Sequence, residues 1–408
     1  MSFFLSVCYI IIEYARPQEM YEYLSNLPLA EIVIILIAIS FLFKQTEMVK
    51  INFTGILMLA YLFCIFVSFL FAFRPDLAWN GLVDFIKWTV IYFVLVNTIN
   101  ERNRLYIFLI IFLLLNFKYA QFAVRVWAEH GFYSSPKGLY EGGGIGSGFF
   151  KNPNDLGVAL NSVFGISFYM IIYDEKKIFN WVKMRWFHLI STFIITLAIL
   201  STSSRGAALG FLGVLFGIWY KSKKKLIVLI LIIVVMVTFI SLIPEDNWYR
   251  FKLIGSDQDE TGQQRVKLWN AGIRMAKEYP LTGVGPYNFI YVNRTFYNSD
   301  LNLVQHNIYV QAISELGFPG IIIFLMMIFS YFYNQKKTRT ILKQFKINDS
   351  FLKGVSHGLD ICMVGFMING FFITVLYYPF FWILLIFSIA LRNVVEKYSI
   401  KILPNSLI

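Results

Sequence analysis

The sequence predicts an all-α polytopic membrane protein, and three observations support this fold class. Of the 408 residues, 58% are hydrophobic and only 15% are charged, whereas a soluble domain carries roughly 25% charged residues. The apolar residues gather in runs of the length that crosses a bilayer, for which a helix needs roughly 20 residues. Lys and Arg gather in alternate loops between those runs, which is the charge pattern of a multi-pass protein.

About twelve apolar segments follow one another along the chain, and we expect each to form a transmembrane helix. The first is short, and it would span only with help from the residues that flank it. The segments are 3–14, 29–43, 53–73, 77–96, 105–124, 156–173, 187–201, 206–220, 226–243, 308–333, 359–376 and 380–391.

The net charge of +12 is explained by membrane orientation. If the N-terminus is cytoplasmic, most of the 36 Lys and Arg fall in inner segments, as the positive-inside rule requires. The C-terminus is then cytoplasmic too, and no nucleic-acid partner is needed to account for the charge. The basic inner segment 336–353 resembles an amphipathic helix on the inner leaflet. Three scattered cysteines form no CxxC or Cys/His cluster, so we expect no metal site.

A polar insert at 244–306 divides the chain into three parts. Residues 1–243 are expected to hold helices 1–9, and residues 307–408 helices 10–12 with the basic cytoplasmic segment. The insert lies on the outer side, between helices 9 and 10. Because it contains helix signals, aromatic residues and turn glycines, we interpret it as an ordered loop domain and as one wall of an active site.

Two polar stretches precede the insert on the outer face. In YEGGGIGSGFFKNPNDLG, residues 140–157, the glycines permit close backbone approach, and Asn154 is a natural N-cap for the next span. In STSSRGA, residues 201–207, Arg205 lies where one span ends and another begins, and arginine binds phosphate with two hydrogen bonds. The alternatives are a flexible surface loop and an arginine that merely reaches the interface.

A third stretch within the insert predicts a helix over 261–280. Thr261 and Gln264 fit a capping box, and Pro280 ends the helix. Arg265 would lie in the first turn, beside the positive end of the helix dipole, where anions bind. The alternative is a surface helix whose Arg265 is simply solvated.

The residues around Arg265 add candidate substrate-binding positions. Trp269 follows Arg265 by four residues on the same helix face, and Lys267 belongs to the same RVKLWNAG motif. Gly283 and Gly285 in the following LTGVGPYNF supply turn glycines.

The fourth stretch, QHNIYVQAISELG, opens the tenth predicted span at residues 305–317. His306 lies at its outer mouth, and histidine is the usual proton acceptor at neutral pH. Asn307, Gln311, Ser314 and Glu315 recur at helical spacing and form a polar stripe, which inside a membrane faces a cavity or the bundle interior. We therefore add Asn307 and Gln311 to the candidate substrate-binding residues; the alternative for His306 is a structural role.

Three charged residues lie deeper in the predicted bundle. Asp84 and Lys87 are three residues apart on one span, and Lys118 is on the next. We expect Asp84 to pair with Lys87 or Lys118, because intramembrane charges pair with one another. A proton or ion path is the alternative.

Together these motifs carry a resemblance. STSSRG after a span, RVKLWNAGIRMAKEYPLTGVGPYNF, and HNIYVQAISELGFPG are similar to the O-antigen ligase and O-antigen polymerase superfamily, over roughly residues 140–330. FFKNPNDLG and EYARPQ also look like segments of its members. The resemblance implies a C-type glycosyltransferase fold of twelve helices in the bacterial inner membrane. It implies inverting transfer of a glycan from an undecaprenyl-pyrophosphate carrier to an acceptor at the outer face, without a metal or another cofactor. Arg205, Arg265 and His306 match the family's paired arginines and histidine.

The acceptor is open at this stage. A polymerase passes the glycan to another lipid-linked repeat and is the function that we expect, with surface polysaccharide as the product. A ligase passes the finished glycan to a lipid A-core or a protein, and a transporter of lipid-linked glycan or an envelope scaffold are further alternatives. The implied partners are the glycan donor, a glycan or lipid-core acceptor, membrane lipids and other proteins of envelope polysaccharide assembly.

Overall fold

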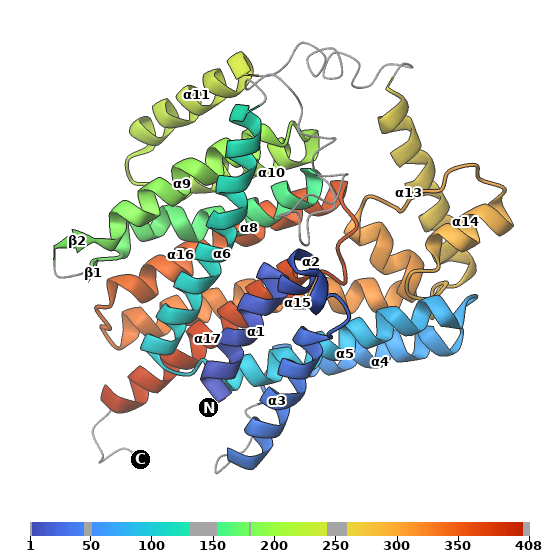
Figure 1. The fold of residues 1–408 in the computed structure, drawn as a ribbon, viewed down its shortest axis with the longest axis horizontal. Coiled ribbons are helices and arrows are strands. Elements are labelled where there is room, and N and C mark those ends of the chain that lie inside the picture. The colour runs from blue at the N-terminus through green and yellow to red at the C-terminus, as the bar shows by residue number, and fades with distance from the viewer. Residues whose placement is uncertain (1, 45–50, 130–152, 179–180, 243–258, 403–408) are drawn as a thin grey trace.

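The computed structural model describes residues 2–44, 51–129, 153–178, 181–242 and 259–402, and within these ranges the protein is almost entirely helical (Figure 1). A two-stranded antiparallel hairpin joins β1 (Lys177–Ile178) to β2 (Val182–Lys183). The helices are α1 (Ser2–Ala15), α2 (Pro17–Met20), η1 (Glu22–Leu24), α3 (Leu29–Lys44), α4 (Phe53–Leu70), α5 (Pro75–Thr98), α6 (Arg102–Glu129), α8 (Pro153–Tyr173), α9 (Met184–Ser201), α10 (Arg205–Lys221), α11 (Lys225–Leu242), α13 (Glu260–Glu278), α14 (Phe289–Tyr297), α15 (Ile308–Gln344), α16 (Ser350–Asn369), η2 (Gly370–Phe372) and α17 (Pro379–Ile402).

Eight of the described helices are long and apolar enough to cross a membrane: α4, α5, α6, α8, α9, α15, α16 with η2, and α17. Three shorter apolar helices lie in α1, α3 and α11. These eleven helices and α10 together overlap the twelve predicted segments, and the all-α membrane class is confirmed. The count of twelve spans stays a prediction, because the shorter helices do not reach the same length.

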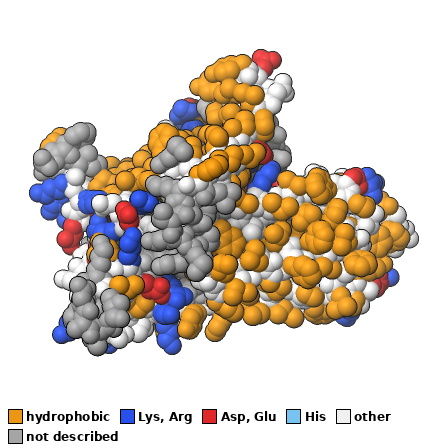
Figure 2. Space-filling model, turned by 90° about the horizontal axis from the view of Figure 1, so that it is seen from below, with side chains coloured by type: hydrophobic (Ala, Val, Ile, Leu, Met, Phe, Trp, Pro, Cys, Tyr) orange, Lys and Arg blue, Asp and Glu red, His pale blue; other side chains and the backbone are white. Residues whose placement is uncertain are grey.

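Large apolar side chains cover much of the surface. Phe63 on α4, Val237 on α11 and Phe329 on α15 are each more than half exposed. Figure 2 shows a broad hydrophobic face, with charged side chains gathered toward its margins. In water such a surface would be a liability, whereas lipid tails solvate it at no cost.

The centre of the bundle is built by helices that approach closely. α8 packs along α16 and also contacts α9 and α10. A Cβ added at Gly165 of α8 would lie 2.5 Å from the carbonyl oxygen of Gly358 of α16, so this crossing requires residues without side chains. Small residues at helix contacts are the usual way to tighten packing in a membrane, where van der Waals contact replaces the hydrophobic drive.

α15 is interrupted close to its beginning. Gly317 has a non-helical backbone (φ 69°, ψ −169°), and Pro319 follows it. Proline has no N–H to donate to the carbonyl four residues earlier, which is that of Glu315. That oxygen instead accepts hydrogen bonds from the Ser68 hydroxyl at 2.7 Å and from the Gly285 N–H at 3.0 Å.

The polar insert docks onto this interruption. The Val284 N–H donates to the Ser314 carbonyl at 2.9 Å, and the Phe318 N–H donates to the Pro280 carbonyl at 2.8 Å. Gly283 has a positive φ of 64°, and a Cβ there would lie 2.3 Å from the Glu315 backbone. The turn between α13 and α14 thus supplies the hydrogen bonds that the broken helix lacks.

The described part of the insert contains two helices, α13 and α14, which pack on a small apolar core of their own; its buried members are Leu268, Met275, Val284, Phe289 and Val292. α14 is an addition to the single helix that we predicted. The beginning of the insert, 244–258, lies outside the described residues, as do 130–152 of the glycine-rich loop.

The basic segment 336–353 forms no separate helix. α15 continues through Gln344, and α16 begins at Ser350. Arg339 of α15 and Lys221 of α10 both pair with Asp360 of α16. These ion pairs tie three helices together at the end that the charge pattern places inside.

Candidate active site

Three segments that are far apart in sequence bring two arginines and a histidine into one region. Arg205 is the first residue of α10, Arg265 lies in α13, and His306 immediately precedes the cap of α15. The charge of Arg205 acts on Arg265, and the charge of Arg265 acts on His306, because each lowers the pKa of the next group. The Asp259 carboxylate pairs with Arg205 and also acts on Arg265.

Among the residues that the structure describes, no carboxylate forms a hydrogen bond or an ion pair with Arg265, although the charge of the nearby Asp259 acts on it. Burial, and then the neighbouring Arg205, lower the pKa of its guanidinium. Its Nε is buried without a hydrogen-bond acceptor, and the guanidinium carbon lies 5.8 Å from the centre of the Phe372 ring. A half-buried guanidinium with free donors is suited to bind a phosphate or carboxylate.

Arg205 has a partner. Its Nη1 lies 3.3 Å from Oδ1 of Asp259, which is also the N-cap of α13 and accepts a hydrogen bond from the Gly262 N–H. The helix therefore begins two residues before the capping box that we predicted at Thr261, and that prediction is wrong. Arg265 is consequently in the second turn, and the Asp259 carboxylate occupies the helix N-terminus.

His306 is held in a left-handed backbone conformation with φ of 48°. Its N–H donates to the Thr374 hydroxyl at 2.8 Å, which ties the start of α15 to the segment between α16 and α17. Burial, and then the charge of Arg265, lower the pKa of the imidazole to about 4. The ring is therefore neutral at pH 7 and can accept a proton or a hydrogen bond.

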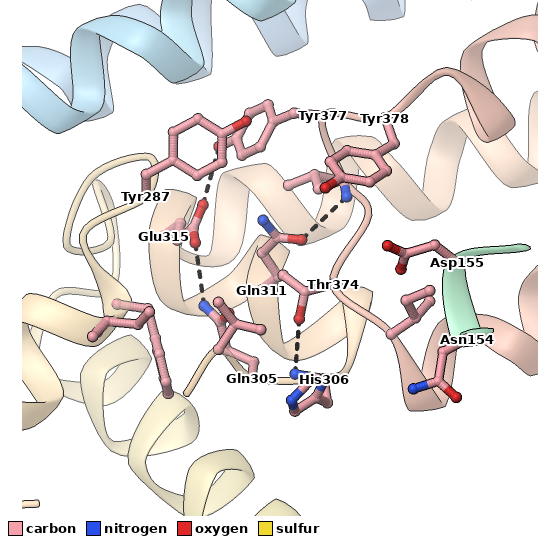
Figure 3. Close-up of a pocket in the computed structure, with 15 residues that line it drawn as sticks. Asn154, Asp155, Tyr287, Gln305, His306, Gln311, Glu315, Thr374, Tyr377 and Tyr378 are labelled. Carbon is pink, nitrogen blue, oxygen red and sulfur yellow. Dashed lines mark hydrogen bonds between the residues drawn. The ribbon is translucent and has the colours of Figure 1, made fainter. Parts of the chain in front are cut away.

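His306 lines a cavity of about 350 Å³ (Figure 3). Glu315 lies on its far side, where Oε1 accepts from the Gln305 amide at 3.2 Å and Oε2 accepts from the Tyr377 hydroxyl at 3.1 Å. Gln311 accepts from the Leu376 N–H at 3.1 Å. The Gln305 side chain is fully buried, and its Oε1 has no donor among the described residues, so the cavity offers an unfilled acceptor to a ligand hydroxyl.

Comparison with protein families bears directly on this region. A family model described as O-Antigen ligase matches residues 190–325. This match supports the O-antigen ligase and O-antigen polymerase superfamily. The match includes both arginines, His306, Glu315 and the break in α15. A comparison with curated proteins gives no significant match.

The O-antigen ligase domain confirms the resemblance that the motifs predicted. The family implies glycan transfer of the O-antigen ligase or polymerase type on lipid-linked glycans. With the apolar helices, it indicates a multi-pass membrane protein.

Two predicted residues of the domain act on the backbone in the structure. Asn307 is the N-cap of α15, and its Oδ1 accepts from the N–H groups of Tyr309 and Val310. The Trp269 indole donates to the Gln305 carbonyl at 3.0 Å. Both contacts hold the chain on either side of His306, so we assign these side chains a positioning role.

Three other predicted positions in the domain do not line the cavity. Lys267 is exposed on α13. Gly283 and Gly285 dock the insert onto α15, where positive φ angles of 64° and 103° and close backbone contacts leave no room for a side chain. These glycines shape the loop and do not contact the cavity.

Asn154 and Gln311 line the cavity at His306, as predicted for substrate-binding residues. α8 begins at Pro153, so Asn154 is inside the first turn and is not the N-cap that we predicted. Its Oδ1 instead accepts a hydrogen bond from the Ser204 hydroxyl, which is the N-cap of α10. Asn154 thereby links the cavity wall to the residue that precedes Arg205.

Several lining residues were not predicted as site residues. Gln305 and Glu315 belong to the stretch 305–317, and Glu315 is part of its polar stripe. Residue spacing alone did not show that their side chains point into the cavity. Thr374, Tyr377 and Tyr378 come from the segment between η2 and α17. The YYP sequence between the predicted spans 359–376 and 380–391 is the signal that could have found the two tyrosines, whereas Thr374 fell inside a predicted span.

Proposed function

We propose that this protein extends a surface polysaccharide by transferring a glycan from an undecaprenyl-pyrophosphate carrier to an acceptor sugar at the outer face of the bacterial inner membrane. The O-antigen ligase domain supports the class of reaction. The observation that carries the proposal is Arg265, a half-buried guanidinium whose Nε has no acceptor and which forms no ion pair among the described residues, and whose charge acts on His306.

In the proposed step, an acceptor hydroxyl oxygen attacks the anomeric carbon of the donor. The bond from that carbon to the phosphate oxygen breaks, and its electron pair leaves with the lipid pyrophosphate. Arg265 and Arg205 bind the pyrophosphate and stabilise the charge that grows on it. Arg205 exchanges its contact with Asp259 for the phosphate, which carries more charge. A single displacement of this kind inverts the anomeric carbon.

The proton of the acceptor hydroxyl goes to His306. Its imidazole is neutral in the free protein because burial and Arg265 lower its pKa to about 4. A bound pyrophosphate adds negative charge beside the ring and raises that pKa, so the imidazole becomes a better base when the donor is in place. The Thr374 contact fixes the backbone of His306, and the neighbouring cavity gives the acceptor room.

The first prediction concerns Arg265. Arg265→Ala should lower turnover by about a hundredfold or more, the usual cost of removing a donor that stabilises developing charge. The measurement is glycan transfer by the purified protein in lipid, beside its melting temperature. Arg274→Ala is the matched control, because Arg274 is on the same helix but is exposed and paired with Glu278 at 2.8 Å. Near-normal transfer by Arg265→Ala would remove the basis of the assignment.

The second prediction separates the polymerase from the ligase, which the match to the O-antigen ligase family keeps as the alternative. The purified protein is reconstituted with lipid-linked repeat units and no other acceptor. A polymerase extends the chain, because one repeat serves as donor and another as acceptor. If products form only when a lipid A-core or protein acceptor is added, the ligase is correct.

A further inference from the structure

A second cavity adjoins the one at His306. It has a volume of about 450 Å³, and its walls come from α1, α3, α5 and the segment that leads into α17. Tyr287, Tyr377 and Tyr378 line both cavities. The Tyr287 ring lies 4.7 Å from the Tyr377 ring, and the Tyr377 hydroxyl donates to Glu315 of the first cavity. The two spaces therefore share one tyrosine wall.

The second cavity is lined by three carboxylates and two cations. Lys87 Nζ lies 2.8 Å from Glu31 and 3.8 Å from Asp84, which confirms the predicted pairing of Asp84 with Lys87. The Tyr287 hydroxyl also donates to Asp84, at 3.1 Å. The third carboxylate is Glu13, and the second cation is Arg16. The lining thus has a net negative formal charge.

One of its polar groups is a buried acceptor that lacks a donor among the described residues. The Glu13 carboxylate lines the same cavity, and no hydrogen bond or ion pair is described for it. The Oε1 atom of Gln18 is buried without a partner, and Gln18 lines the same cavity. Buried acceptors without donors are costly unless a ligand supplies hydrogen-bond donors.

The aromatic side chains of the second cavity indicate which class of ligand it binds. Five aromatic residues surround the space: Tyr9, Trp88, Tyr287, Tyr377 and Tyr378. A sugar ring offers apolar C–H faces that pack on aromatic rings, and hydroxyls that donate to carboxylates. A pyrophosphate would instead be repelled by the excess of carboxylates.

We propose that this second cavity binds the sugars of the acceptor glycan, and this inference rests on the proposed function. The acceptor sugar lies between α1, α3 and α5, with its hydroxyls on Glu13 and Gln18. Its terminal hydroxyl reaches past the three tyrosines into the first cavity, beside His306. Donor and acceptor then approach the reacting atoms from opposite sides, and the pyrophosphate stays with the arginines.

The test needs a ligand that can act only as an acceptor. The probe is the glycan released by mild acid from the protein's own lipid-linked repeat, which has lost its pyrophosphate. Ala30→Leu adds bulk to the cavity, since Ala30 lines it, and Ala38→Leu is the same change on the same helix away from it. Glu13→Gln removes one carboxylate charge with little change in shape.

Ala30→Leu and Glu13→Gln should raise the KM for the free glycan about tenfold, a modest loss of binding energy, and leave the KM for the lipid-linked donor unchanged. Ala38→Leu should change neither. An unchanged acceptor KM in both pocket variants overturns the inference, as does an equal rise in donor and acceptor KM.

Calorimetric binding of the free glycan separates this inference from the proposed function. Binding to the wild type that is kept in Arg265→Ala and lost in Ala30→Leu supports the cavity even if no transfer is measured. Transfer at the normal rate, with glycan binding unaffected by Ala30→Leu, leaves the proposed function intact and overturns the cavity assignment.

Discussion

His306 shows at the residue scale how its surroundings change the chemistry of a side chain. A free histidine is partly protonated near neutral pH, whereas burial and the charge of Arg265 lower the pKa of His306 to about 4. Arg265 is likewise made a stronger anion binder by enclosure, because its Nε has lost water and has gained no acceptor among the described residues. Neither property is a feature of the residue type alone.

The third prediction follows from this pKa. The profile of kcat/KM against pH reports groups of the free protein, so its acid limb should be centred near pH 4 and not near 6.5. Stability should also fall as pH drops from about 6.5 to about 4, because the unfolded histidine binds a proton that the folded one does not. The measurements are transfer rates and melting temperatures from pH 4 to 8. A limb near 6.5 that disappears in His306→Gln would contradict the pKa.

At the scale of elements, the break in α15 joins the membrane helix to the insert. Gly317 and Pro319 free the carbonyls of Ser314 and Glu315, and the turn at 283–285 supplies their donors. Glu315, two residues before Gly317, lines the same cavity as His306. Because the contact is made by backbone atoms, there is no room for a side chain at Gly283 or Gly285.

The fourth prediction tests this contact. Gly283→Ala should destabilise the protein by more than the roughly 1–2 kcal/mol of a left-handed backbone, since its Cβ would lie 2.3 Å from the Glu315 backbone. Gly217→Ala is the control: its Cβ would meet only the terminal methyl of Ile361, at 2.8 Å, and alanine favours the helix. Thermal unfolding in detergent should show a much larger loss for Gly283→Ala. Equal shifts would mean that the turn is not held as described.

At the scale of the whole molecule, the features of the site gather at one end of the bundle. His306, Arg265 and both cavities lie where the charge pattern predicts the outer face, whereas the Asp360 ion pairs with Lys221 and Arg339 lie at the opposite end. Such a division suits a reaction between a lipid-borne donor and an acceptor on one side of a membrane.

The fifth prediction tests that orientation. A cysteine at Ser299, after α14, should react with a membrane-impermeant maleimide in intact cells, because the insert is predicted to be outside. A cysteine at Lys346, between α15 and α16, should react only after the membrane is opened. If the cysteine at Lys346 reacts in intact cells and the one at Ser299 only after the membrane is opened, the predicted topology is inverted. If neither cysteine reacts, the test is repeated at other positions on the same two loops.

The helices were predictable because apolar runs and loop charges are local properties. The motifs around Arg205, Arg265 and His306 also indicated the family, which the match to 190–325 confirms. The helix caps were predicted less well. The N-cap of α13 is Asp259 and not Thr261, and α8 begins at Pro153, so that Asn154 lies inside the helix. Caps depend on one or two residues, and a polar neighbour can take the same hydrogen bond.

By itself, the sequence determined an all-helical membrane protein, its predicted orientation and three cationic residues that belong together. Only the tertiary structure decided which polar side chains share a space. Glu13, Glu31 and Asp84 are separated by long stretches of chain, and no periodicity relates them to Tyr377 or His306. Their meeting depends on how whole helices pack, and packing is set by contacts between distant residues that a local pattern does not contain.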